Sequence, residues 1–192
     1  MVGGEKPPTL IQIHKMANKM SLQDFIDKFI IDGIKPVVDN QPFLAFILLS
    51  SAIEFLGKCM NDSNDWHKHG KSEYNFCNAI QTFTSFKEYK QAFGKNTTVK
   101  GHKDVYKNSL YWELRCAMVH ALQPRSGIVL RGDNNDLANK TLGCKELYED
   151  VVKAYEEVKA MYTNRTVSIY INGSETGATP TAITKIQSHT DK

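Results

Sequence analysis

The sequence has few of the residues that mark several common protein classes. Its four cysteines, among 192 residues, form no Cys-x-x-Cys pair, so neither a zinc ribbon nor a disulfide framework is predicted. There is no glycine-rich phosphate loop, no Gly-x-Ser-x-Gly turn and no internal repeat. These absences argue against a P-loop nucleotidase, an α/β-hydrolase and a solenoid.

Arginine is also scarce. Only four of the 24 Lys and Arg residues are arginines, and the net charge is +3. A mildly basic protein can bind a polyanion, but this charge does not by itself predict one. Because arginine is the residue suited to holding a phosphate with two parallel hydrogen bonds, each of the few arginines is a candidate for a specific role.

Long hydrophobic runs are missing as well. The most apolar stretch, FLAFILLSSAIEFLG at residues 43–57, contains two serines and Glu54, and it is too short and too polar to span a bilayer. It predicts a central helix of a soluble bundle and no membrane association. The N-terminal residues MVGGEKPPTL lack the apolar core of a signal peptide. A cytoplasmic, reducing location is therefore expected.

Apolar residues recur at helical spacing through most of the chain. We expect helices over about residues 21–35, 42–57, 73–92, 104–123 and 145–162. Short strands are expected at Ile128–Leu130 and Thr166–Ile171, paired with each other. The predicted fold is all-α, an up-and-down bundle of four to five helices with a small two-stranded β hairpin appended. Residues 1–172 would form one domain, and residues 173–192, rich in Thr, Ser and Gly, a flexible tail.

Several helix ends have recognisable signals. Ser21 followed by Asp24 resembles a capping box at the start of the first helix. That helix should stop or bend at Pro36, which lacks a backbone N–H group. Asn40 is a candidate N-cap for the next helix, whose first turn would contain Pro42.

The stretch LYWELRCAMVHALQPRSG, residues 110–127, combines an amphipathic pattern with two chemically distinctive residues, Arg115 and His120. Five residues on a straight α-helix separate two side chains by roughly 140° around the axis. The two side chains would then point to different faces. A site that uses both requires either a helix that ends or kinks near His120, which Pro124 favours, or a second copy of the helix from a partner chain.

The segment Leu114-Arg115-Cys116-Ala117-Met118-Val119-His120 resembles the Rx4-6H motif of the HEPN superfamily. The resemblance covers the helical part of the chain, about residues 21–162. It implies an all-helical domain that forms a homodimer, with the two motifs facing each other, and that cleaves RNA without a metal or cofactor. Arg115 and His120 are the catalytic residues that the resemblance implies.

The residue types fit that chemistry. A histidine with an ordinary pKa near ~6.5 can take a proton from a ribose 2′-hydroxyl or donate one to the leaving 5′ oxygen. Arg115 would stabilise the charge on the phosphate. Tyr111, one turn earlier, is either a base-stacking residue or a core aromatic. Cys116 occupies a position where the family often has Asn, Asp or His, and this departure bears on activity more than on fold.

Glu54 has two interpretations as the one charged residue of the most apolar helix. It either pairs with Lys58 one turn later in the same helix or faces Arg115 from a neighbouring helix and fixes its orientation.

A second set of candidates precedes the Arg115 helix. The segment GKNTTVKGHK contains Lys95, Lys100, His102 and Lys103 and no acidic residue. It is either a solvated loop or a source of phosphate contacts for RNA. The loop at residues 61–72 contains His67 and His69, which are too weakly patterned to predict a metal site.

The sequence therefore leaves two functions open. One is a metal-independent endoribonuclease of the toxin or defence type, with an antitoxin or other protein partner. The other is a noncatalytic HEPN-like dimeric module that binds RNA, a nucleotide or a protein.

Overall fold

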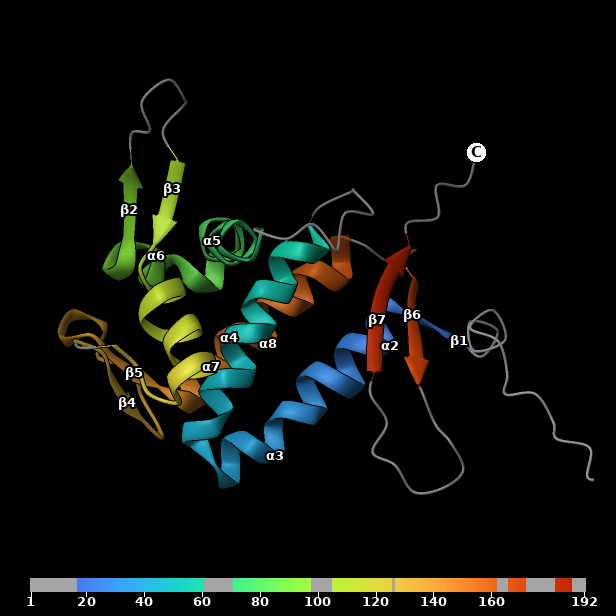
Figure 1. The fold of residues 1–192 in the computed structure, drawn as a ribbon, viewed down its shortest axis with the longest axis horizontal. Coiled ribbons are helices and arrows are strands. Elements are labelled where there is room, and N and C mark those ends of the chain that lie inside the picture. Colours follow the sequence, from blue (N-terminus) through green and yellow to red (C-terminus); the bar gives the residue numbers. More distant parts are fainter. Residues whose placement is uncertain are drawn as a thin grey trace, which may run out of the picture.

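The computed structural model describes residues 17–60, 71–97, 105–125, 127–161, 166–171 and 182–187. These residues are mainly helical and include three small β-sheets (Figure 1). The helical elements are α2 (Leu22–Phe25), η2 (Ile26–Ile31), α3 (Asp32–Asn40), α4 (Pro42–Cys59), α5 (Ser72–Thr82), η3 (Thr84–Phe86), α6 (Lys87–Phe93), η4 (Tyr111–Cys116), α7 (Ala117–Ala121), η5 (Leu137–Asn139) and α8 (Cys144–Met161). The strands are β1 (Ala17–Ser21), β2 (Gly94–Thr97), β3 (Val105–Asn108), β4 (Val129–Arg131), β5 (Thr141–Gly143), β6 (Thr166–Ile171) and β7 (Ala182–Gln187).

Helix α4 lies at the centre of the core. It contacts α3, α5 and α8, and Figure 1 shows α4 and α8 crossing in the middle of the molecule. Within the described part of the chain it is the one helix long and apolar enough to cross a membrane by length and composition, yet 56% of its residues are buried inside the protein. This burial agrees with the prediction of a core helix.

Gly57 determines how closely α5 approaches α4. A Cβ atom at this position would lie 1.8 Å from the backbone oxygen of Asn75, far inside van der Waals contact. Only glycine permits the two helices to lie this close together. The close approach brings Ser72, the first residue of α5, near the C-terminal half of α4.

The first helix starts as predicted but does not end as predicted. The hydroxyl of Ser21 accepts a hydrogen bond of 2.9 Å from the backbone N–H of Asp24. The helix then continues through the π-helical turn η2 and through Pro36 to Asn40, so of the two expected outcomes, a stop or a bend at Pro36, the stop is wrong. Burial of Ile34 and Val38 on either side of the proline offsets the lost hydrogen bond.

The boundary between α3 and α4 also differs from the prediction. Asn40 does not cap α4, because it is the last residue of α3 and its side-chain amide donates to the backbone oxygen of Pro36 at 2.8 Å. Gln41 precedes α4 instead, without a side-chain cap. Pro42 does occupy the first turn of α4, as predicted.

Two other predicted helices are shorter than expected. The helix expected over residues 73–92 is divided into α5, η3 and α6, because Phe83 adopts an extended conformation that buries its ring. The helix expected from Asp104 begins only at Leu110, since the preceding residues Val105–Asn108 form strand β3. Helix α8, in contrast, matches its prediction closely.

The β structure is more extensive than predicted. Strands β2 and β3 form an antiparallel hairpin, in which β2 falls within the expected loop and β3 within the expected start of the next helix. The predicted pairing of Ile128–Leu130 with Thr166–Ile171 is wrong, because β4 pairs in parallel with β5. Strand β6 instead lies between β1 and β7 in an antiparallel sheet.

Within the predicted tail, Ala182–Gln187 forms strand β7, which pairs with β6. This segment has too few apolar residues to fold alone, but as β7 it supplies backbone hydrogen-bond partners to an edge of β6 that would otherwise be unpaired. Backbone pairing of this kind does not depend strongly on side-chain composition.

Candidate functional site

Arg115 is held by an ion pair with Glu54. Nη2 of Arg115 lies 2.7 Å from Oε2 of Glu54, and the glutamate side chain is 7% exposed. The other carboxylate oxygen of Glu54 lies 3.2 Å from Nζ of Lys58. Both contacts considered for Glu54 in the sequence analysis are therefore made. One carboxylate pairs with Lys58 of its own helix and with Arg115 of η4.

The electrostatics of this cluster favour the charged forms of both partners. Burial raises the pKa of the Glu54 carboxyl, but the charge of Lys58, a hydrogen bond from Ser72 and the charge of Arg115 together outweigh burial and bring that pKa below its usual value. For Arg115, burial acts to lower the pKa, but the charge of Glu54, the hydrogen bond to Glu54 and the neighbouring Tyr111 and Cys116 together outweigh burial and raise that pKa. The ion pair is therefore maintained at neutral pH.

Tyr111 supports Arg115 from the same helical segment. The guanidinium carbon of Arg115 lies 5.7 Å from the centre of the Tyr111 ring, and that ring packs against Phe76 at 5.8 Å. Burial and a hydrogen bond with Cys116 raise the pKa of Tyr111 to about 12. Tyr111 is 7% exposed, so it is a core aromatic that positions the arginine and is not available to stack on a base.

Arg115 retains hydrogen-bonding capacity. Its Nε atom is buried and has no hydrogen-bond partner among the described residues, and its side chain is 20% exposed. A guanidinium group carries five N–H donors. The cluster with Glu54 therefore fixes the orientation of Arg115 without using all of its donors.

The helix that contains the motif is not a straight α-helix. Its first part, η4, is a π-helical turn that includes Arg115, and its second part, α7, is α-helical and includes His120. The helix ends when Leu122 adopts a left-handed conformation with φ 54°, two residues before Pro124. A helix end close to His120 was one of the two expectations from the sequence.

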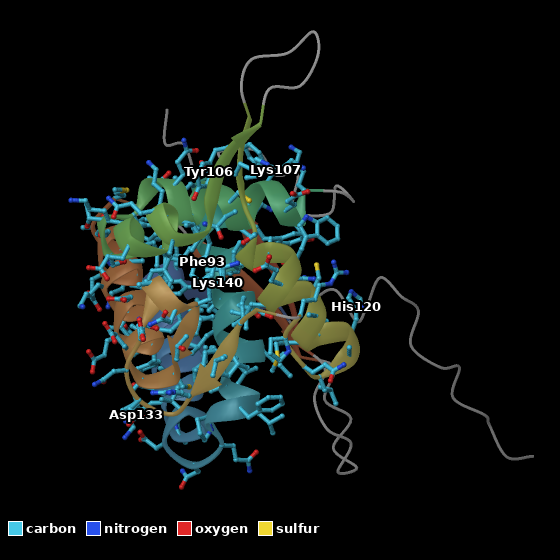
Figure 2. All side chains as sticks on the ribbon, turned by 90° about the vertical axis from the view of Figure 1, so that its left-hand side faces the viewer. Phe93, Tyr106, Lys107, His120, Asp133 and Lys140 are labelled. Carbon is cyan, nitrogen blue, oxygen red and sulfur yellow. The ribbon has the colours of Figure 1, made fainter. Side chains whose placement is uncertain are left out.

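His120 has different surroundings from Arg115. It is exposed in the last turn of α7 and lines a shallow depression of about 460 Å³ together with Trp112, Cys116 and Arg125. Trp112, Cys116 and His120 share this face because they are spaced four residues apart. Figure 2 shows His120 at the outer edge of α7. Arg115 is not among the residues that line the depression, although its neighbour Cys116 is.

Two residues of this depression were not anticipated from the sequence. Trp112 is 47% exposed, and its indole N–H donates to Glu73 at 3.1 Å, which fixes the ring beside Cys116. Arg125 follows the helix end and is held by a backbone hydrogen bond of 2.9 Å to the carbonyl of Glu113. The sequence did contain a signal for Trp112, namely its four-residue spacing from Cys116 and His120. It contained none for Arg125, whose position is set by how the chain turns after α7.

Of the predicted basic segment, the structure describes only residues 94–97. Lys95 is exposed on β2. Lys100, His102 and Lys103 lie outside the described residues, as do His67 and His69. Within the described ranges, no group of three or more His, Cys, Asp or Glu side chains is arranged to hold a metal ion. None of the four cysteines, all within the described residues, forms a disulfide, and Cys116 is the one that is not buried.

No family model, curated protein or solved structure matches this chain.

Proposed function

We propose that this protein is a HEPN-like, metal-independent endoribonuclease that uses Arg115 and His120 at a homodimer interface. The observation that carries the proposal is the arrangement of these residues on one helix: Arg115 is fixed by Glu54 and Tyr111, and His120 is exposed one turn and a half later. In this proposal the helices around α4 correspond to an up-and-down bundle, and the protein acts in the cytoplasm on RNA.

The proposed dimer is supported by the different surroundings of the two residues. Arg115 pairs with Glu54 of α4 and His120 lines the depression, and in the proposal each site takes one of these residues from each of two chains. The surface next to His120 suits such contact. Trp112, Val119 and Leu122 are 47%, 40% and 60% exposed, respectively, on the same helix and its end. Exposed apolar side chains that lie close together are typical of protein interfaces.

The proposed reaction breaks the RNA chain through its own 2′-hydroxyl. The 2′ oxygen loses its proton and bonds to phosphorus, and the bond from phosphorus to the 5′ oxygen breaks as that oxygen gains a proton. His120 can carry out either proton transfer at neutral pH. The guanidinium group of Arg115 stabilises the negative charge on the nonbridging oxygens through charge-assisted hydrogen bonds.

A second function is favoured by two specific observations. Cys116 lies beside His120 in the depression, where a thiol is a weak hydrogen-bond partner, and the charge of Arg115 is already balanced by Glu54. These features are compatible with a noncatalytic dimeric module that binds RNA, a nucleotide or a protein partner such as an antitoxin. Such a module requires no hydrogen-bond partner for His120 and no unpaired charge on Arg115.

RNA cleavage by the purified protein in excess EDTA tests the proposal. Wild type should cleave, whereas Arg115→Ala and His120→Ala should lose at least a hundredfold in rate, a typical contribution of one acid–base or charge-stabilising group. Arg131→Ala removes an exposed arginine on β4 and serves as the control, with activity like wild type. A folded wild-type dimer that binds RNA without cleaving it would support the binding module instead.

A further inference from the structure

A concave surface at the base of the β2–β3 hairpin is separate from the Arg115 and His120 region. It has a volume of about 470 Å³ and lies between α6, the end of α5 and the starts of the two strands. Its lining includes Gln81, Lys87, Lys90, Lys95 and Tyr106. Figure 2 shows Tyr106 on this hairpin, well apart from His120. We call this surface the hairpin pocket.

The hairpin pocket is positively charged and lacks acidic residues. Neither Lys87 nor Lys95 has a carboxylate partner among the residues that the structure describes, and no Asp or Glu lines the pocket. Lys107, on the same hairpin, differs because it pairs with Glu73 at 3.0 Å. Three ammonium groups around one hollow repel each other, and an anion bound between them would relieve that repulsion.

Lys90 is directed toward the pocket by its neighbours. Its Nζ atom donates to the backbone oxygen of Gln81 at 3.4 Å and lies 6.0 Å from the centre of the Tyr106 ring. A lysine ammonium has three donors, so contacts of this kind orient it and leave donors for a ligand.

Tyr106 adds a neutral hydrogen-bond donor. The side-chain N–H of Asn108 donates to the Tyr106 hydroxyl oxygen at 2.9 Å. The direction of this bond is fixed, because the amide oxygen of Asn108 accepts from the backbone N–H of Leu110 at 3.0 Å. The Tyr106 hydroxyl is therefore an acceptor toward Asn108, and its own proton is free for a ligand oxygen. Burial raises the pKa of Tyr106, so the hydroxyl keeps this proton at neutral pH.

Gly94 allows Tyr106 to lie in the pocket. A Cβ atom there would lie 2.7 Å from the Tyr106 hydroxyl oxygen and 2.1 Å from the backbone oxygen of Lys90. Any larger residue would move the phenol or separate the hairpin from α6. The donors of the pocket are thus fixed by backbone packing and a buried amide, as expected for a preformed binding site.

We infer that the hairpin pocket binds a phosphate group of an RNA chain, through Lys87, Lys90 and Lys95 together with the hydroxyl of Tyr106. The choice of RNA rests on the proposed function, while the preference for phosphate follows from the pocket itself. Phosphate oxygens accept hydrogen bonds from ammonium and hydroxyl groups, and lysine contacts to them carry no sequence information. The pocket would anchor the substrate at a distance from the cleavage site.

Binding of a fluorescein-labelled 2′-O-methyl oligouridylate of twelve nucleotides tests the inference. This probe lacks the free 2′-hydroxyl and cannot be cleaved, so the result does not depend on catalysis. The triple variant Lys87→Gln/Lys90→Gln/Lys95→Gln should bind at least about tenfold more weakly, and the slope of log K against log salt should fall by about 2, as expected for three lost phosphate contacts on a single strand.

Two matched variants make the test specific. Lys28→Gln/Lys140→Gln/Lys145→Gln removes the same charge from exposed lysines elsewhere and should change affinity less than threefold. Tyr106→Phe should weaken binding about threefold or more without changing the salt slope. If only the general surface charge mattered, this substitution would leave the affinity unchanged, because it removes no charge. Equal affinities for the two triple variants, or an unaffected Tyr106→Phe, would overturn the inference.

Competition distinguishes RNA from a free nucleotide. Uridine monophosphate and inorganic phosphate should displace the labelled oligonucleotide only when their concentrations far exceed the concentration of the oligonucleotide. If either competes as well as an unlabelled oligonucleotide, the assignment to an RNA chain is wrong. Lysine-dependent binding without cleavage of ordinary RNA would support the pocket and contradict the ribonuclease. Cleavage of ordinary RNA by wild type, together with unchanged binding by the triple variant, would support the ribonuclease and contradict the pocket.

Discussion

The carboxylate of Glu54 joins two helical segments, because Oε2 contacts Arg115 at 2.7 Å while Oε1 contacts Lys58 at 3.2 Å. This arrangement makes Glu54 more important to folding than Arg115. Loss of Arg115 leaves the glutamate paired with Lys58, whereas loss of Glu54 leaves the guanidinium group beside Tyr111 without its counter-ion.

We therefore predict that Glu54→Gln lowers the free energy of unfolding by about 2 kcal/mol and that Arg115→Met costs about half as much. A double-mutant cycle in urea should give a coupling energy of about 1–2 kcal/mol. The exposed pair of Lys35 and Asp39 provides the control, since Asp39→Asn should lower the free energy of unfolding far less than Glu54→Gln does. Equal costs for Glu54→Gln and Asp39→Asn would contradict the central position of this carboxylate.

The same residue should influence stability in acid. The pKa of Glu54 is lower in the folded protein than its usual value of 4.5, so the unfolded chain takes up the proton first as pH falls. The stabilisation from ionised Glu54 is complete above about pH 4.5 and is lost as the pH falls through the lowered pKa. Urea unfolding from pH 6 to about pH 3 should show a shallower loss of stability for Glu54→Gln than for wild type. Glu149→Gln, an exposed control, should follow the wild-type curve.

The end of α7 contains a strained residue. Leu122 has φ 54° and is 60% exposed, so its side chain contributes little burial while its backbone is left-handed. Leu122→Gly should raise the free energy of unfolding by about 0.5–1 kcal/mol, because glycine adopts this conformation without steric cost. Ala121→Gly, one residue earlier and helical, should lower it by about 1 kcal/mol. Thermal unfolding of both variants gives the comparison, and destabilisation by both would contradict this account of the helix end.

Cys116 should react with a maleimide much faster than the other cysteines in the folded protein. Cys59, Cys77 and Cys144 are buried, and burial raises the pKa of Cys77 and raises that of Cys144 to about 11. Mass spectrometry should find one rapid addition to wild type and none to Cys116→Ser. The adduct would fill the depression beside His120 and should reduce RNA cleavage. Rapid labelling of a second cysteine would show that the core opens more readily than this packing implies.

The long amphipathic and apolar helices were predictable because their pattern extends over many residues. Helices α4 and α8 match their expected positions within about two residues, and Ser21 caps its helix as predicted. The failures occur where the decisive contact is distant in sequence. Burial around Pro36 overrides a local helix breaker, and β6 pairs with β1 near the opposite end of the chain instead of with Ile128–Leu130.

The candidate site was predictable only in part. The pairing of Glu54 with both Lys58 and Arg115 agrees with both alternatives, since helical spacing implies one contact and the need to neutralise a buried carboxylate implies the other. The hairpin pocket was not predictable. Lys95 was identified by composition, but Lys87 and Lys90 belong to α6 and meet it only through the β2–β3 hairpin.

The most direct test of the shared site uses a heterodimer of Arg115→Ala and His120→Ala chains, isolated with two different affinity tags after co-expression. If each site takes Arg115 from one chain and His120 from the other, one of the two sites in this heterodimer is intact. We predict about half of the wild-type RNA cleavage rate per dimer, while each variant homodimer is inactive. A heterodimer as inactive as the two homodimers, beside an active wild type, would contradict the shared site.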